Sequence, residues 1–169
     1  MHDIKINSVT GSEIITTQDV KDFVRIDTSA DDTLIGRIIA TSRLWCENYI
    51  GKDIVAKNRT FYLKEVDDRF TLPFSPIASI SSVTSEDIAV SYNTYGLDDT
   101  IIELKSLPAK EVKVTYVTTG LSDDLVKNAL LNLAATYYDN RADFKTGETI
   151  SEIPTGTKNI LQGFKTMYI

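Results

Sequence analysis

Apolar residues recur at helical spacing near both ends of the chain and alternate with polar residues in between. Two helices are predicted between Thr16 and Gly51. Thr16 can cap the first, and an acidic residue three positions later, Asp19, completes a capping box. Ser29 is the predicted cap of the second helix, and Gly51 can end it in a left-handed conformation. The apolar stripe of the first helix is Val20, Phe23 and Val24, and that of the second is Leu34, Ile35, Ile38, Ile39, Trp45, Cys46, Tyr49 and Ile50. We expect the loss of Trp45 to impair folding most.

After Gly51 the period changes to two, which is typical of strands. The predicted strands are Asn58–Val66, Phe70–Leu72, Ile77–Thr84, Ile88–Tyr92, Thr100–Leu104 and Glu111–Thr118. The segment Pro73–Pro76 interrupts regular pairing and predicts an extended corner. Asn93–Gly96 has turn chemistry. Most links between these strands are short, which favours antiparallel pairing.

Helical spacing returns after Gly120. Ser122 and the two aspartates after it form a start signal, and the helix that follows carries a second long apolar stripe. The polar segment Asn140–Ser151 is predicted to be a loop, and Thr157–Tyr168 a short last helix. The order of elements predicts an α+β fold with N-terminal helices, a central antiparallel β-sheet, and C-terminal helices packed with the N-terminal helices. We expect one domain over residues 1–169, with 16–51 helical, 54–118 β-rich, 122–141 a long helix, and 142–169 a loop and C-terminal docking segment.

Composition narrows the class of protein. The chain has 169 residues, a formal charge of −6 and one cysteine, so an internal disulfide framework is excluded. No apolar run approaches the roughly 18 residues of a membrane span. The first residues, MHDIKINSVTGSE, do not resemble a signal peptide, and we expect synthesis and residence in the cytoplasm. An acidic balance argues against a surface that grips phosphate backbones.

Candidate catalytic and metal-binding residues are few. The single histidine, His2, lies on a terminus that we expect to fray, and Cys46 lies on an apolar stripe, where a structural thiol is favoured over a nucleophile. Four Asp-Asp pairs could form a divalent-cation site or a carboxylate dyad, but their positions favour helix starts and turns. The pairs are Asp31-Asp32, Asp67-Asp68, Asp98-Asp99 and Asp123-Asp124. We therefore expect no catalytic residue, cofactor or metal.

The C-terminal part of the chain offers candidates for binding. Tyr137 and Tyr138, followed closely by Arg141, could stack on nucleic-acid bases, although such a pair on an apolar stripe usually contributes to packing. The apolar and aromatic segment Phe164–Ile169 either folds back on its own core or docks into a partner groove. The sequence leaves both interpretations of this segment open.

Four stretches in order resemble the head–tail connector, or adaptor, proteins of tailed double-stranded-DNA bacteriophages, which complete the phage head. They are Ile15–Asp27, with an "LRID"-like turn at its end, the long helix Asp31–Gly51, the corner and strand Leu72–Val83, and the helix Leu125–Arg141. Ile153-Pro154 and Leu161–Phe164 match the usual ending of the family. The chain departs from the family at Phe164-Lys165, where an arginine-bearing pair is usual, and Ile88–Leu107 matches nothing specific.

The resemblance implies a non-enzymatic virion protein that assembles in the host cytoplasm and resides at the head–tail interface. Such proteins form a ring, usually of twelve subunits, beneath the portal protein and join it to a stopper or tail-completion protein. Viral DNA passes through the lumen without sequence-specific binding, and no membrane is involved. The partner-binding residues that the resemblance implies are Tyr138, Arg141, Phe144, Ile153, Pro154, Leu161, Phe164, Met167, Tyr168 and Ile169.

Other functions stay open at this point. The chain could be another phage neck or tail-completion protein with a similar layout of helices and sheet. It could also be a cytoplasmic α+β module that binds a small molecule or peptide, although no convergent polar site is evident. An enzyme ranks last, because helix capping and turns account for the titratable residues.

Overall fold

The structure is a computed structural model that describes residues 2–140 and 155–165. It contains two compact units. The β unit comprises Met1–Ser12 and Val55–Leu121, and the helical unit comprises Glu13–Ile54 and Ser122–Ile169. Each unit is therefore built from two separate stretches of the sequence, and each is described by itself below.

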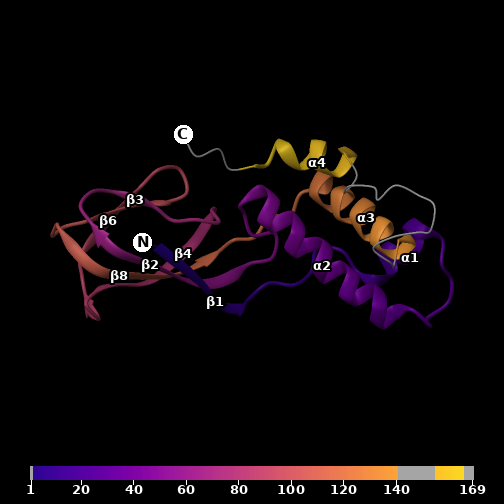
Figure 1. Cartoon of the computed structure of the whole chain (residues 1–169), viewed down its shortest axis with the longest axis horizontal. Helices are drawn as coiled ribbons and strands as arrows, with labels where there is room; N and C mark the ends of the chain where they lie inside the picture. The colour runs from indigo at the N-terminus through magenta and orange to yellow at the C-terminus, as the bar shows by residue number, and fades with distance from the viewer. Residues whose placement is uncertain (1, 141–154, 166–169) are drawn as a thin grey trace. The chain divides into compact units, whose positions relative to one another are not determined.

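The β unit holds a five-stranded antiparallel sheet in the order β1-β2-β8-β4-β5, of which Figure 1 labels β1, β2, β4 and β8. Its strands are β1 (His2–Val9), β2 (Lys57–Val66), β4 (Ile77–Ser85), β5 (Ile88–Ala89) and β8 (Ala109–Thr118). A three-stranded antiparallel sheet has the order β3-β7-β6. Its strands are β3 (Phe70–Thr71), β6 (Tyr92–Tyr95) and β7 (Ile101–Leu104). The antiparallel pairing predicted from the short links is confirmed.

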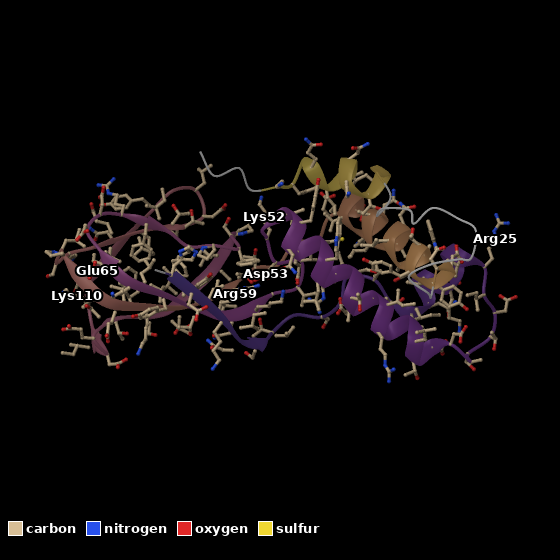
Figure 2. All side chains as sticks on the ribbon, in the orientation of Figure 1. Arg25, Lys52, Asp53, Arg59, Glu65 and Lys110 are labelled. Carbon is tan, nitrogen blue, oxygen red and sulfur yellow. The ribbon has the colours of Figure 1, made fainter. Side chains whose placement is uncertain are left out.

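The core of the β unit lies on one face of β8. Its even-numbered residues Val112, Val114 and Tyr116 are completely buried, as the alternating pattern predicted. In the register of the sheet, Val114 lies opposite Phe61 of β2 on one side and Val83 of β4 on the other. The second sheet supplies Ile102 and Leu104, and the remaining members are Val66, Leu72 and Ala109. The pairing of β2 with β8 extends as far as Glu65 opposite Lys110 and Val66 opposite Ala109, and Figure 2 shows Glu65 and Lys110 at the same end of the sheet.

The helical unit packs α3 (Asp124–Asp139) against three other helices: α1 (Thr17–Val24), α2 (Asp32–Ile50) and α4 (Thr155–Gln162) (Figure 1). This confirms the prediction that the C-terminal helices pack with the N-terminal ones. The residues that fill the core recur at helical spacing, as predicted from the stripes. They are Val20, Ile35, Ile38, Ile39, Cys46, Ile50, Val126, Ala129, Leu130, Leu133, Ala134 and Leu161.

The predicted helix caps are confirmed in part. The Thr16 hydroxyl accepts from the Asp19 amide at 3.1 Å, and the Asp19 carboxylate accepts from the Thr16 amide at 2.6 Å, which completes the capping box. Gly51 ends α2 in the left-handed conformation, with φ of 69°. Arg25 adopts the same conformation after α1, and Figure 2 shows its side chain projecting away from the ribbon.

The predicted start of α2 at Ser29 is wrong. Residues 28–32 form a tight turn in which the Ala30 amide donates to the Thr28 hydroxyl and the Asp32 amide donates to the Ser29 carbonyl. This turn delays the first helical residue to Asp32 and makes Asp31 the N-cap residue. In α3 the capping side chain is Asp123, which accepts from the Leu125 amide at 2.8 Å, and not Ser122.

Two further expectations are corrected, and the effect of losing Trp45 on folding stays a prediction. His2 lies in β1, where it pairs with Leu63 and its ring is 6.2 Å from that of Phe61, so this part of the chain is an ordered strand that the sequence did not predict. Asn93–Tyr95 belongs to β6 and not to a turn, because Tyr92–Tyr95 pairs with β7. Trp45 is only half-buried and stacks on Tyr49, with 5.2 Å between ring centroids.

Candidate interaction surface

Tyr138 lies near the end of α3 and binds the start of α2. Its hydroxyl donates to the Asp31 carboxylate, and both side chains are half-buried. The next residue, Asp32, forms an ion pair with Lys21 of α1, with 3.0 Å between Nζ and Oδ1. The structure thus places Tyr138 in a polar cluster that joins α1, α2 and α3. Its hydroxyl already has a partner within its own unit.

α4 is folded onto the helical unit. Leu161 has no exposed surface and contributes to the core, and Thr157 is buried beside it on the same helix. Phe164 follows the helix and is half-buried, and its amide donates to the Leu161 carbonyl at 3.0 Å. The exposed Lys165 places its ammonium group 5.2 Å from the centre of the Tyr49 ring. Of the residues predicted to bind a partner, Leu161 is thus internal and Phe164 lies at the rim of the unit.

The other predicted partner-binding residues lie outside the described residues. They are Arg141, Phe144, Ile153, Pro154, Met167, Tyr168 and Ile169. The predicted Asn140–Ser151 loop lies outside them as well, apart from Asn140, the C-cap residue of α3.

A surface groove between α1 and α3 is the feature that sequence reasoning missed. It has a volume of about 410 Å³ and its apolar lining includes Ile14, Phe23 and Leu131, while Asp19, Asp22 and Lys127 supply charge. Phe23 was assigned to the apolar stripe of the first helix, but 45% of its surface is exposed. The stripe on α1 is wider than α3 can cover, which leaves an aromatic side chain open to solvent.

The charge of one groove residue, Asp19, depends on its hydrogen bonds at the N-cap of α1. Hydrogen bonds from the Thr16 backbone and side chain lower the pKa of Asp19, so this carboxylate stays ionised. Asp22 accepts from Gln18 at 2.6 Å, and Lys127 lies 3.3 Å from Asp124. An apolar floor with two carboxylates and one ammonium group suits a protein partner better than an anionic polymer.

A buried polar network holds the end of α2. The Glu47 carboxylate is 2% exposed, accepts from Arg43 at 2.9 Å, and accepts from the Ile54 amide at 3.0 Å. The Arg43 Nε donates to both carboxylate oxygens of Glu13 at 2.9 Å. The network therefore joins the segment before α1 to both sides of the turn after α2. The sequence offered a weak signal for it, an arginine and a glutamate four residues apart.

The sequence model of the head completion protein family matches residues 13–165. The chain belongs to this family. The comparison with curated protein sequences finds no match.

Solved structures of gene transfer agent particles contain chains with a similar fold. A chain in the neck of an empty particle, computed with C6 symmetry, has a TM-score of 0.75 and 17% identity, covering 99% of this chain and 97% of that one. A chain in the native virion has a TM-score of 0.75 and 17% identity, covering 98% and 96%. A chain in the neck of a native particle, computed with C12 symmetry, has a TM-score of 0.69 and 18% identity, covering 98% and 97%. These likenesses extend the shared fold over β1, which precedes the family match.

Among the described residues, the candidate catalytic groups considered above, Cys46 and the Asp-Asp pairs, lie at structural positions. Burial raises the pKa of the Cys46 thiol to about 12, so it remains protonated and unreactive. The Asp-Asp pairs serve the turns and helix starts predicted for them, as when Asp68 accepts from the Arg69 amide at 2.7 Å. Within residues 2–140 and 155–165, no group of three potential ligands from His, Cys, Asp and Glu could hold a metal ion. Nor does this part of the chain include a helix with the length and apolarity needed to cross a bilayer.

Proposed function

We propose that this chain is a head–tail connector, or adaptor, subunit of a phage-like virion. The observation that carries the proposal is the family match over residues 13–165, and the fold shared with chains of neck and virion structures supports it. The subunit resides at the head–tail interface after assembly in the host cytoplasm. Its role is structural, and we propose that it performs no catalysis.

The subunits form a ring, and twelve is the number that we propose. C12 and C6 symmetries were used for the gene transfer agent necks that contain the similar chains. A ring requires two different surfaces on each subunit, because rotation brings one surface of a copy against another surface of the next. Exposed apolar side chains such as Ile6, Val9 and Ile88 supply candidates for such surfaces.

We further propose that the ring binds the portal protein on one side and a stopper or tail-completion protein on the other. Among the described residues, Phe164 and the groove around Phe23 are the sites that we assign to these contacts. Leu161 could contact a partner only if α4 moved, because it is buried in its own unit. The net charge of −6 supports a lumen through which DNA passes without binding, since like charges repel.

The test is to measure the mass of the purified chain by sedimentation velocity and native mass spectrometry, alone and with the portal protein of the same particle. A ring that forms alone or on the portal supports the proposal. A monomer without portal is compatible with it, because a ring can require its template. A chain that never joins the portal contradicts it, and binding to a tail protein instead would identify a tail-completion protein.

A further inference from the structure

Among residues 2–140 and 155–165, no strand pairs with the outer side of β1 or with most of the outer side of β4, so both edges of the five-stranded sheet are open for much of their length. β1 forms one edge over the eight residues His2–Val9. On the opposite side, β5 pairs with β4 only at Thr84 and Ser85, and the Val90 amide adds one bond to the Val83 carbonyl. The segment Ile77–Ser82 of β4 therefore forms the rest of that edge. Long open edges are templates for pairing with another chain, and proteins usually keep them short or cover them.

The exposed side chains on these edges suit a protein contact. Ile6 and Val9 of β1 are 44% and 54% exposed, and Ile88 of β5 is 70% exposed. The open part of β4 instead presents small exposed side chains that would let another strand approach closely. They are Ala78, Ser79, Ser81 and Ser82. One edge thus offers apolar side chains and the other offers access to its backbone.

The directions of the strands allow β1 of one copy to pair with β4 of another. β1 is antiparallel to β2, β2 to β8, and β8 to β4, so β1 and β4 run in opposite directions. If a second copy continues the sheet in the same sense, its β1 meets β4 of the first copy in antiparallel orientation. Antiparallel pairs outnumber parallel ones, and the pairing leaves one open edge at each end for the next copy.

We infer that the open edge of β1 in one subunit pairs with the open edge of β4 in the next, forming a continuous sheet between copies of this chain. The contact is head-to-tail, so it generates a ring when the rotation closes. This inference rests on the proposed ring and names the surfaces that form it. A bulge interrupts β1 between Ile6 and Ser8, so we expect the shared ladder to use His2–Ile6. On β4 the pairing with β8 shifts register between Ile77 and Ser79 and between Ile80 and Ser82, so we expect only a short run of ladder bonds there.

The incoming strand must replace a local contact. The Ile4 amide donates to the Asp3 carboxylate at 2.8 Å, where Asp3 is exposed and Ile4 is half-buried. A bond between neighbouring residues of this kind satisfies an edge amide while the subunit is alone. When β1 pairs with β4, the Ile4 amide would donate to a backbone carbonyl of β4 in place of the Asp3 carboxylate. The isolated subunit and the paired subunit therefore differ little in the number of hydrogen bonds.

The test uses two double variants that place charge on one edge at a time. His2→Lys/Ile6→Lys blocks β1, and Ser79→Lys/Ser81→Lys blocks β4, because ammonium groups oppose desolvation at a sheet edge. All four residues are exposed, so the fold should persist, as circular dichroism and the unfolding midpoint can verify. The matched control is Leu97→Lys/Leu107→Lys, which adds the same charge at exposed apolar residues away from both edges.

We expect the wild type and the control to form rings, with portal protein if it is needed, and each blocked variant to form none. An equal mixture of the two blocked variants should give dimers and nothing larger, because one intact β1 and one intact β4 remain per pair. Rings formed by either blocked variant would overturn the inference and leave the connector function standing. Dimers of the β4-blocked variant alone would also overturn it, since they indicate pairing of β1 with itself.

Cross-linking gives an independent readout that does not depend on disruption. In a Lys5→Cys/Ser79→Cys variant, oxidation within assembled rings should produce a ladder of covalent multimers, while each single variant should not. Cys46 is buried and does not interfere. Assembled rings that yield no ladder from any pairing of β1 with β4 cysteines would overturn the inference. A wild type that never forms a ring, even with portal, would instead contradict the proposed function itself.

Discussion

The hydroxyl of Tyr138 donates a hydrogen bond to the carboxylate of Asp31, a residue 107 positions earlier in the chain. The bond joins the last turn of α3 to the N-cap residue of α2. Because α3 also packs on α1 and α4, this contact fixes one end of the helix that organises the unit.

Tyr138→Phe should lower the free energy of unfolding by about 1.5–3 kcal/mol, the range for hydrogen bonds to charged groups. Urea unfolding at neutral pH measures the change. Tyr137→Phe is the matched control, because no described residue forms a hydrogen bond with the Tyr137 hydroxyl, and it should change the value little. If Tyr138→Phe left stability intact and weakened portal binding, the side chain would serve the partner instead.

Glu47→Ala should destabilise the protein by about 3–5 kcal/mol, since it removes one partner of a buried ion pair. The Ile54 amide and the Arg43 guanidinium would both lose an acceptor in a buried region. Glu13→Ala removes the more exposed partner of Arg43, and we expect a loss of at most about 1 kcal/mol. Chemical denaturation of both variants checks the order. Equal effects would mean that Arg43 and not Glu47 dominates the network.

Thr16→Ala should lower the free energy of unfolding by about 1 kcal/mol at neutral pH, because the N-cap of α1 is lost. The pKa of Asp19 is lowered from its ordinary value of 3.8 by hydrogen bonds from Thr16. A group with a lowered pKa in the folded state contributes stability that is present above the unfolded value and is lost as the pH falls through the folded value. The difference between wild type and Asp19→Ala should therefore be largest well above pH 3.8 and shrink below it. Urea titrations at several pH values test this, and a difference that is constant with pH would contradict it.

Leu161→Ala should destabilise the protein by about 2–5 kcal/mol, as expected for a fully buried leucine. Phe164→Ala removes a half-buried side chain at the rim, and should cost less stability while weakening association with portal. Thermal unfolding and portal binding of both variants separate the two roles. The reverse pattern, with Leu161→Ala stable but unable to bind portal, would show that α4 leaves its own unit to dock.

The capping box, the glycine stop and the alternating strands were predictable because they depend on residues close together in the sequence. Ser29 failed as a cap because Thr28, Ser29 and Asp31 all can accept backbone bonds, and only the turn geometry selects Asp31. β1 escaped prediction because its partner β2 begins at Lys57, and its exposed face gives little alternation.

The candidate surface was less predictable than the fold. Helical spacing places Phe23 and Val20 on one stripe, yet Val20 is buried and Phe23 is 45% exposed. This difference in burial depends on how far α3 extends over α1. The spacing of apolar residues within α1 alone does not predict it. Leu161 shows the same limit, since an apolar residue on a short helix has one pattern whether it fills its own core or a partner's groove.

The division of the chain also sets an order of folding during synthesis. Every strand of the β unit has left the ribosome once Leu121 has emerged, and its sheets need no later residue. α1 and α2 emerge much earlier, but the helix that covers their apolar stripes begins only at Asp124. They must wait as exposed amphipathic segments until α3 is made. A nascent chain stalled when Leu121 has just emerged from the exit tunnel should therefore resist protease over the strands and be cut within the first two helices.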